Sequence, residues 1–133
     1  MSTRSVIAKE NPDGSVISVF CHWDGYPSHN GRILLENYKE DLDVSGLLLG
    51  GNISSLRESS DQPEGHSLDN PVDGYTVYYG SECPSTILES IKEIDKIDWC
   101  QEFEYLFKDG KWMFRDVYKK SEWKELTMKD CEE

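Results

Sequence analysis

The sequence predicts an α+β fold, in which an antiparallel sheet of about five strands carries two main helices on one face. Two pairs of β-rich segments, each joined by a short turn, indicate two hairpins, and a further short segment supplies a middle strand. Apolar residues at helical spacing in two other segments indicate the helices. At 133 residues the chain is expected to form a single domain, residues 1–133.

The first hairpin is predicted from residues 5–9 and 15–22, which flank the turn Asn11-Pro12-Asp13-Gly14. Proline presets φ for a turn, and glycine supplies the positive φ that closes a hairpin. In the second strand the odd-numbered residues from Ile17 to Trp23 share one face. The even-numbered residues from Val16 to His22 share the other face, and one of the two faces is expected to be more buried.

The first helix is expected to begin near Asn30, a good N-cap residue, and to end near Glu40. One apolar stripe recurs at four-residue intervals, at Leu34, Tyr38 and Leu42. Residues 44–49 form an apolar run that suits one more helical turn before Gly50-Gly51. Residues 53–56 are a candidate for a further turn.

Residues 57–74 are rich in Ser, Asp, Pro and Gly and have no apolar periodicity, so they predict a long surface loop. Binding and disorder are both compatible with such a loop. Residues 75–79 then predict a strand, because they combine β-branched and aromatic side chains.

A second helix is predicted over residues 86–96 by the capping box of Thr86 and Glu89. Isoleucines at helical spacing support it, namely Ile87, Ile91 and Ile94. Residues 99–107 and 111–118 then flank Asp109-Gly110, a two-residue hairpin signal. The predicted register pairs Phe107 with Trp112, Tyr105 with Phe114, and Glu104 with Arg115. The acidic, lysine-rich tail, residues 121–133, is expected to be mobile, with a last helical turn through Trp123 and Leu126.

The formal net charge is −12, from 26 acidic and 14 basic residues, and it lies in the later two thirds of the chain. This charge disfavours direct binding to nucleic acid or to an anionic membrane, and it favours a basic partner. The four cysteines are widely spaced without a C-x-x-C pair, which argues against zinc and redox motifs. No apolar run approaches the ~20 residues of a membrane span, and no signal peptide is evident, so a cytosolic protein is expected.

Residues 21–32 form the stretch that is densest in groups able to bind or react. The candidate ligand-contacting residues in this loop are His22, Trp23, Asp24, Tyr26, His29 and Arg32. Histidine and aspartate are zinc ligands, and Ser28 or Cys21 beside a histidine has the composition of a nucleophilic site. Neither spacing matches a known signature, and the single glycine of Asn30-Gly31-Arg32 does not make a P-loop. We therefore predict no enzyme, metal or cofactor, and leave a structural and a ligand-binding loop as alternatives.

The segment from Glu82 to Glu104 is the candidate partner-binding surface. Its acidic residues are Glu82, Glu89, Glu93, Asp95, Asp98 and Glu102. Carboxylates displayed about as densely as duplex phosphates can occupy a basic nucleic-acid channel. The alternative is a solvated face that only keeps the protein in solution.

Three segments resemble a widespread family of small phage- and prophage-encoded proteins. They are TRSVIA at residues 3–8, CHWDGYPSHNGRILL at 21–35 and ISSL at 53–56. The resemblance covers residues 3–56 and implies a phage setting, with the cytosol of an infected host cell as location. It implies no activity and no catalytic residues.

A phage setting and an acidic surface together suggest an anti-defence protein of the anti-CRISPR or anti-restriction type. Such an inhibitor would act as a DNA mimic on a basic host protein or ribonucleoprotein complex. The alternatives are a small enzyme or ligand- or metal-binding protein that uses the His22–Arg32 loop, and a phage structural or assembly protein. The sequence identifies neither the partner nor the oligomeric state.

Overall fold

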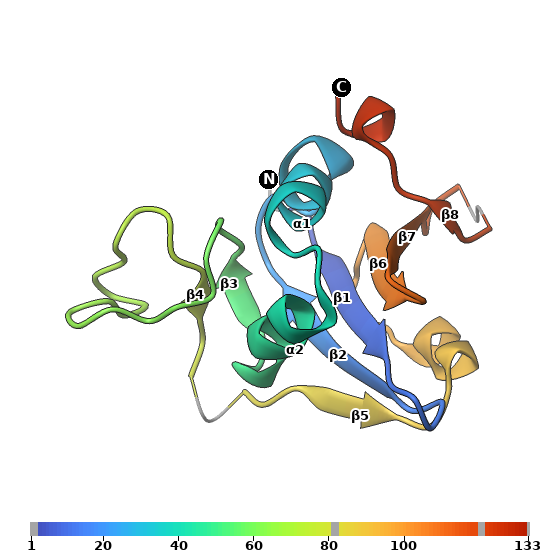
Figure 1. Ribbon diagram of the computed structural model, residues 1–133, viewed down its shortest axis with the longest axis horizontal. Helices are drawn as coiled ribbons and strands as arrows, with labels where there is room; N and C mark the ends of the chain where they lie inside the picture. Colours follow the sequence, from blue (N-terminus) through green and yellow to red (C-terminus); the bar gives the residue numbers. More distant parts are fainter. Residues whose placement is uncertain (1–2, 81–82, 120–121, 133) are drawn as a thin grey trace.

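The computed structural model describes residues 3–80, 83–119 and 122–132, and its fold is α+β (Figure 1). Within these residues an open, mixed sheet of eight strands runs in the order β4-β3-β2-β1-β6-β7-β8, and β5 pairs with β2 beside β3. The strands are β1 (Ser5–Glu10), β2 (Val16–Cys21), β3 (Ile53–Ser55), β4 (Val77–Tyr78), β5 (Thr86–Leu88), β6 (Phe103–Lys108), β7 (Lys111–Asp116) and β8 (Lys124–Glu125). The helices are the π-helix η1 (Pro27–Gly31), α1 (Arg32–Asn37), α2 (Asp41–Leu49), and the 3₁₀ helices η2 (Ile91–Lys96) and η3 (Met128–Cys131).

The predicted antiparallel sheet of about five strands is wrong, because two of the strand pairs are parallel. β1 lies parallel to β6, and β2 lies parallel to β3. The connection from β2 to β3 contains α1 and α2, and a helical crossover of this kind lets the chain return in the same direction.

Both predicted hairpins are confirmed. β1 pairs antiparallel with β2, and β6 pairs with β7 in the predicted register, in which Phe107 faces Trp112. Asp109 and Gly110 have φ values of 53° and 77°, so both residues of the turn are left-handed, as a two-residue hairpin of type I′ requires.

The helices of the first half are confirmed, but their predicted bounds are not. Asn30 is buried inside η1 and does not cap a helix, and α1 already ends at Asn37 because Tyr38 leaves the helical region at φ −122°, ψ 67°. α2 begins earlier than predicted, after a capping box formed by Glu40 and Asp43. Residues 53–56 are not helical, because Ile53–Ser55 pairs with β2 and β4 as strand β3.

The predicted helix over residues 86–96 is wrong. Residues 86–88 form β5 and pair with β2, and only Ile91–Lys96 is helical, as a 3₁₀ turn. Ile91, Ile94 and Ile97 are three residues apart, which is the repeat of a 3₁₀ helix. The capping box therefore lies in and just after a strand.

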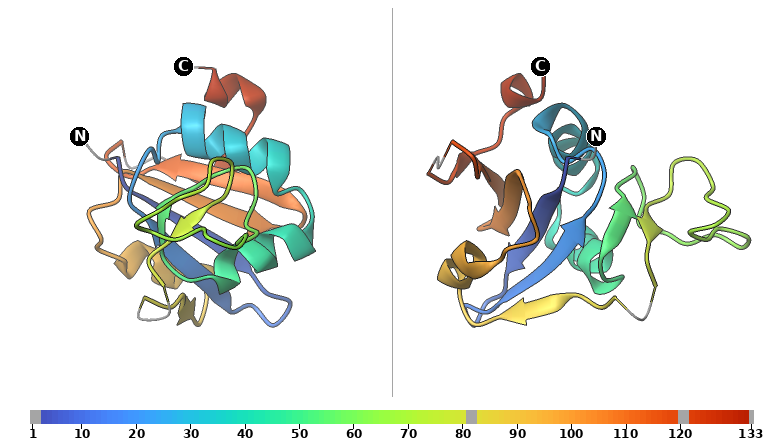
Figure 2. Two further views of the ribbon diagram at one scale, coloured as in Figure 1. Left: turned by 90° about the vertical axis from the view of Figure 1, so that its left-hand side faces the viewer. Right: turned by 180° about the vertical axis from the view of Figure 1, so that it is seen from behind.

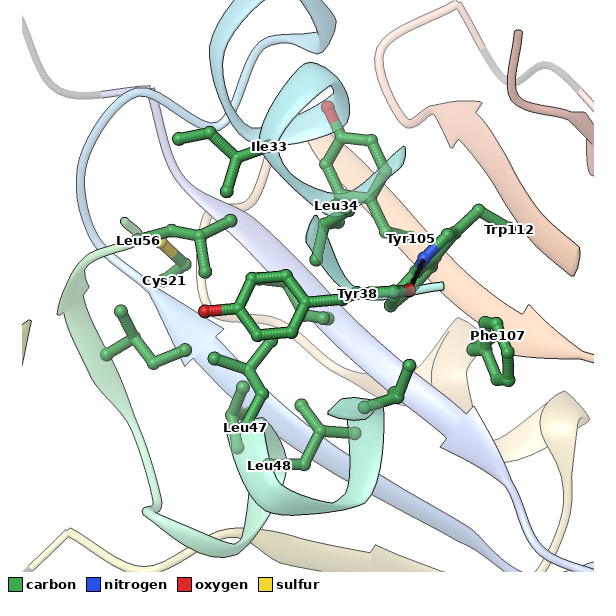
Figure 3. Close-up of a cluster of buried hydrophobic side chains, with 14 of the residues drawn as sticks. Cys21, Ile33, Leu34, Tyr38, Leu47, Leu48, Leu56, Tyr105, Phe107 and Trp112 are labelled. Carbon is green, nitrogen blue, oxygen red and sulfur yellow. Dashed lines mark hydrogen bonds between the residues drawn. The ribbon is translucent and has the colours of Figure 1, made fainter. Parts of the chain in front are cut away.

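The sheet is covered on both faces. The larger core packs α1 and α2 on β-strand residues such as Ile7 and Val19. Figure 3 shows part of this core, including Leu34, Leu47 and Tyr105. On the other face Ala8, Val16 and Leu106 pack against η2 through Ile94. In the tail, the predicted helical turn lies later, as η3, while Lys124–Glu125 pairs with β7.

Candidate functional site

The loop of residues 22–26 is fixed to the sheet by its backbone. The Tyr105 hydroxyl donates to the Gly25 carbonyl at 2.6 Å, and the Gly25 amide donates to the Thr3 carbonyl at 2.8 Å. A Cβ on Gly25 would lie 2.8 Å from both the Ser5 Cβ and the Thr3 oxygen. Glycine is therefore needed here for close approach, and the loop is a structural joint between β2 and η1.

The buried side chain of Asn30 also holds the connection between β2 and η1 in place. Its Nδ2 donates to the Ser5 Oγ at 3.2 Å and to the Cys21 Sγ at 3.3 Å, and the residue is fully buried. Its Oδ1 lies 2.9 Å from the His29 Nδ1. Because Nδ2 donates twice, Oδ1 accepts, and the His29 Nδ1 therefore carries a proton.

The structure brings the predicted ligand-contacting residues together only in part, because Tyr26 contacts Asp24 and His29, with the Tyr26 and His29 ring centres 6.2 Å apart. His22 lies between the rings of Phe20 and Trp23, with centroid distances of 5.8 and 4.5 Å. Asp24 accepts from the Tyr26 hydroxyl at 3.1 Å, and this hydrogen bond raises the pKa of Tyr26.

The remaining groups of the loop are also used in packing. Arg32 donates to the Cys131 carbonyl at 3.0 Å, far along the chain. Burial raises the pKa of the Cys21 thiol to about 11, which disfavours the thiolate that a nucleophile needs. Among the described residues no three His, Cys, Asp or Glu side chains lie close enough together to hold a metal ion.

The predicted partner-binding carboxylates differ in solvent exposure and in whether they are ion-paired. Glu82 lies outside the described residues. Glu89 and Asp98 are exposed and Glu102 is half-buried. The other two are paired, Glu93 with Lys96 at 3.2 Å and Asp95 with Arg115.

Arg115 also connects η2 to the sheet. Its Nε pairs with the buried Glu104 carboxylate at 2.5 Å, and its guanidinium lies 4.3 Å from the centre of the Trp123 ring. Gln101 donates to the second oxygen of Glu104 at 2.9 Å. Glu104 and Asp95 therefore hold η2 against the sheet, and of these two carboxylates only Asp95 is exposed.

A second acidic surface was not predicted and lies around α2 and the loop of residues 57–74; we call it the α2–loop end. Residues 36–73 contain nine acidic and two basic residues, a net charge of −7. At its centre the pKa of Tyr38 is raised to about 12, first by burial and then by the nearby charges of Glu58, Asp43 and Asp61.

Two leucines on α2 are exposed at the α2–loop end. Leu42 is 83% and Leu49 is 74% exposed. They lie four residues before and three residues after Gly46, so all three share one helix face. A Cβ on Gly46 would lie 3.9 Å from the Ser60 Oγ, so this face borders the loop. The four-residue spacing predicts Leu42 in the apolar stripe of the first helix, but α1 ends before it, at Asn37.

The base of the loop is held by His66, a residue that sequence analysis did not select. Its Nε2 lies 3.0 Å from the Thr76 carbonyl, and its Nδ1 accepts from the Val72 amide at 2.9 Å. In residues 57–74 the structure has no helix or strand beyond an isolated bridge between Ser59 and Tyr75.

The loop and the η2 segment lie at opposite ends of the long axis of the molecule (Figures 1 and 2). The loop of residues 57–74 is therefore not adjacent to the η2 part of the predicted partner-binding surface.

No family model, characterised protein or solved structure matches this chain. Among the described residues, no helix is both long and apolar enough to cross a membrane.

Proposed function

We propose that this protein is a non-enzymatic, phage-encoded inhibitor that binds a basic nucleic-acid-handling surface of a host defence complex. The observation that carries the proposal is the α2–loop end, where a net charge of −7 surrounds two exposed leucines. Exposed apolar anchors inside a charged rim are typical of protein interfaces. The negative rim would steer the protein towards a basic channel and compete there with nucleic acid.

The α2–loop end supports this function better than the η2 segment does. The η2 segment keeps exposed carboxylates at Glu89 and Asp98, but Glu93 and Asp95 are already paired with basic side chains. Beside η2 the described residues expose a single large aliphatic side chain, Ile87 at 64%, and no pair on one helix face. Because the two ends are far apart, one compact partner would contact only one of them.

Two matched charge reversals test which end binds. Asp61→Lys/Glu64→Lys/Asp69→Lys changes the loop, and Glu89→Lys/Asp98→Lys/Glu102→Lys changes the η2 segment by the same charge. Each variant is titrated against CRISPR effectors and restriction nucleases, with and without DNA, at rising salt. We expect binding that weakens with salt, competes with DNA and is lost only in the loop variant.

The leucines give a separate readout. Leu42→Ala/Leu49→Ala leaves the charge unchanged, so it should weaken binding by about tenfold or more while the salt dependence stays the same. Binding that ignored salt and both reversals would refute the charge-mimicry proposal. A defined homo-oligomer that binds no effector would favour the structural or assembly alternative.

A further inference from the structure

We propose that a depression between the Tyr26–Ser28 segment and the C-terminal region binds a mononucleotide, that is, a small phosphate-bearing ligand with a planar ring. Its volume is about 660 Å³, within the range of small-molecule sites. Its lining includes Tyr26 and Ser28 from the loop before α1, Phe103 and Phe114 from the β6–β7 hairpin, and three lysines. This site is independent of the partner-binding surface proposed above.

The first argument is that three lysines gather at this depression although the protein as a whole has a net charge of −12. Lys119, Lys124 and Lys129 line the depression together with Asp116 and Asp130. Among the described residues, neither Lys119 nor Lys129 takes part in an ion pair, and both are exposed. A phosphate would supply the counter-charge that these ammonium groups lack.

Lys124 is already positioned by its neighbours. Its Nζ lies 3.1 Å from the Asp130 carboxylate and 5.0 Å from the centre of the Phe114 ring. Asp130 itself is fixed, because it accepts from the amide and hydroxyl of Thr127 at 3.0 and 2.9 Å. A preorganised ammonium group loses less conformational entropy on binding an anion.

The aromatic residues are the second argument. Tyr26 is 38% exposed and Phe103 is half-buried, so each leaves ring surface at the depression. A planar base can stack on such surface while the phosphate lies among the lysines. A polynucleotide fits less well, because its further phosphates would extend beyond the lysines over a protein of net charge −12 and be repelled. A mononucleotide places its one phosphate among the lysines.

The test is titration of the full chain, followed by amide chemical shifts and calorimetry, with adenosine 5′-monophosphate, ribose 5-phosphate and adenosine as probes. We expect saturable binding of the mononucleotide at low salt, with the largest shifts at residues 26–28, at Lys119 and at residues 124–130. Lys119→Gln/Lys129→Gln should weaken it by about tenfold or more. Lys92→Gln/Lys108→Gln removes two exposed lysines elsewhere and should leave the affinity unchanged.

The ring is tested separately. Tyr26→Ala should reduce the advantage of the mononucleotide over ribose 5-phosphate, because it removes a ring on which the base would stack. Among the described residues the Tyr26 hydroxyl bonds to Asp24 alone, so the substitution removes one hydrogen bond besides the ring. Equal affinities of these two probes for the wild-type protein would overturn the base-binding part. No saturation up to about 10 mM mononucleotide, or equal weakening in both lysine pairs, would overturn the site.

Discussion

Gly50 shows how a single residue sets the distance between α2 and β4. Its φ is −71°, which any residue adopts, so torsion does not require glycine here. Space does, because an added Cβ would lie 2.4 Å from the Tyr78 ring, whose hydroxyl donates to the Leu47 carbonyl at 2.6 Å. We expect Gly50→Ala to lower the free energy of unfolding by about 1–3 kcal/mol, measured by urea denaturation.

Gly46→Ala is the matched control in the same helix. A Cβ there meets only the Ser60 Oγ at 3.9 Å, an ordinary contact. Alanine is the better helix former by roughly 0.5–1 kcal/mol, so this variant should be neutral or more stable. Similar losses in both variants would mean that the Tyr78 contact is not what selects glycine at position 50.

At the scale of elements, Arg115 ties η2 to the β6–β7 hairpin through Asp95 and the buried Glu104. Removing one partner of a buried ion pair leaves the other charge without compensation, which typically costs about 3–5 kcal/mol. We expect Arg115→Ala to lose stability on this order in urea unfolding, and Glu104→Ala/Arg115→Ala to lose less than the sum of the single variants.

The exposed ion pair of Lys96 and Glu93 serves as the control for the buried pair of Arg115 and Glu104. Lys96 is 75% exposed, so Lys96→Ala should change stability by at most about 0.5 kcal/mol. Strictly additive losses for Glu104 and Arg115 would contradict the coupling that their 2.5 Å contact implies.

The elements that the sequence predicts correctly are those that local contacts determine. The hairpin around Asp109-Gly110 needs only a turn and alternating side chains, and its register was predicted residue by residue. The pairing of β1 with β6 joins residues about a hundred positions apart, and no local pattern reports it. Residues 86–88 form a strand because they pair with the edge of β2 at residues 16–18. This tertiary pairing outweighs the local helix preference that the capping box indicates.

The candidate sites divide in the same way. The sequence shows the density of polar groups in residues 21–32. It does not show that Asn30 and Gly25 form hydrogen bonds to Ser5 and Tyr105 that attach this segment to the sheet. The depression beside Tyr26 requires lysines from residues 119–129, which only the folded chain brings near. The exposure of Leu42 depends on where α1 ends, and that boundary is set by the backbone of Tyr38.

At the scale of the whole molecule, the core contains several weak acids that must stay protonated. Cys21, Tyr38 and Tyr105 lie in the larger cluster (Figure 3). Burial raises the pKa of Cys21 from 9.0 to about 11 and that of Tyr38 from 10.0 to about 12. Burial also raises the pKa of Tyr78 and Tyr105. In the unfolded chain these groups ionise at their ordinary, lower pKa values.

Stability should therefore be constant below pH 9 with respect to these groups and fall above it, because the unfolded state loses its protons first. Cys21 alone is expected to account for roughly 2–3 kcal/mol between its unfolded pKa of 9.0 and its folded pKa of about 11. Tyr38 adds to the loss above pH 10. The measurement is urea unfolding across this range, with Cys21→Ala as the control. That variant should be less stable at about pH 8 but decline less steeply just above pH 9, before the tyrosines contribute. Parallel curves for the two proteins would show that the thiol is not the group being titrated.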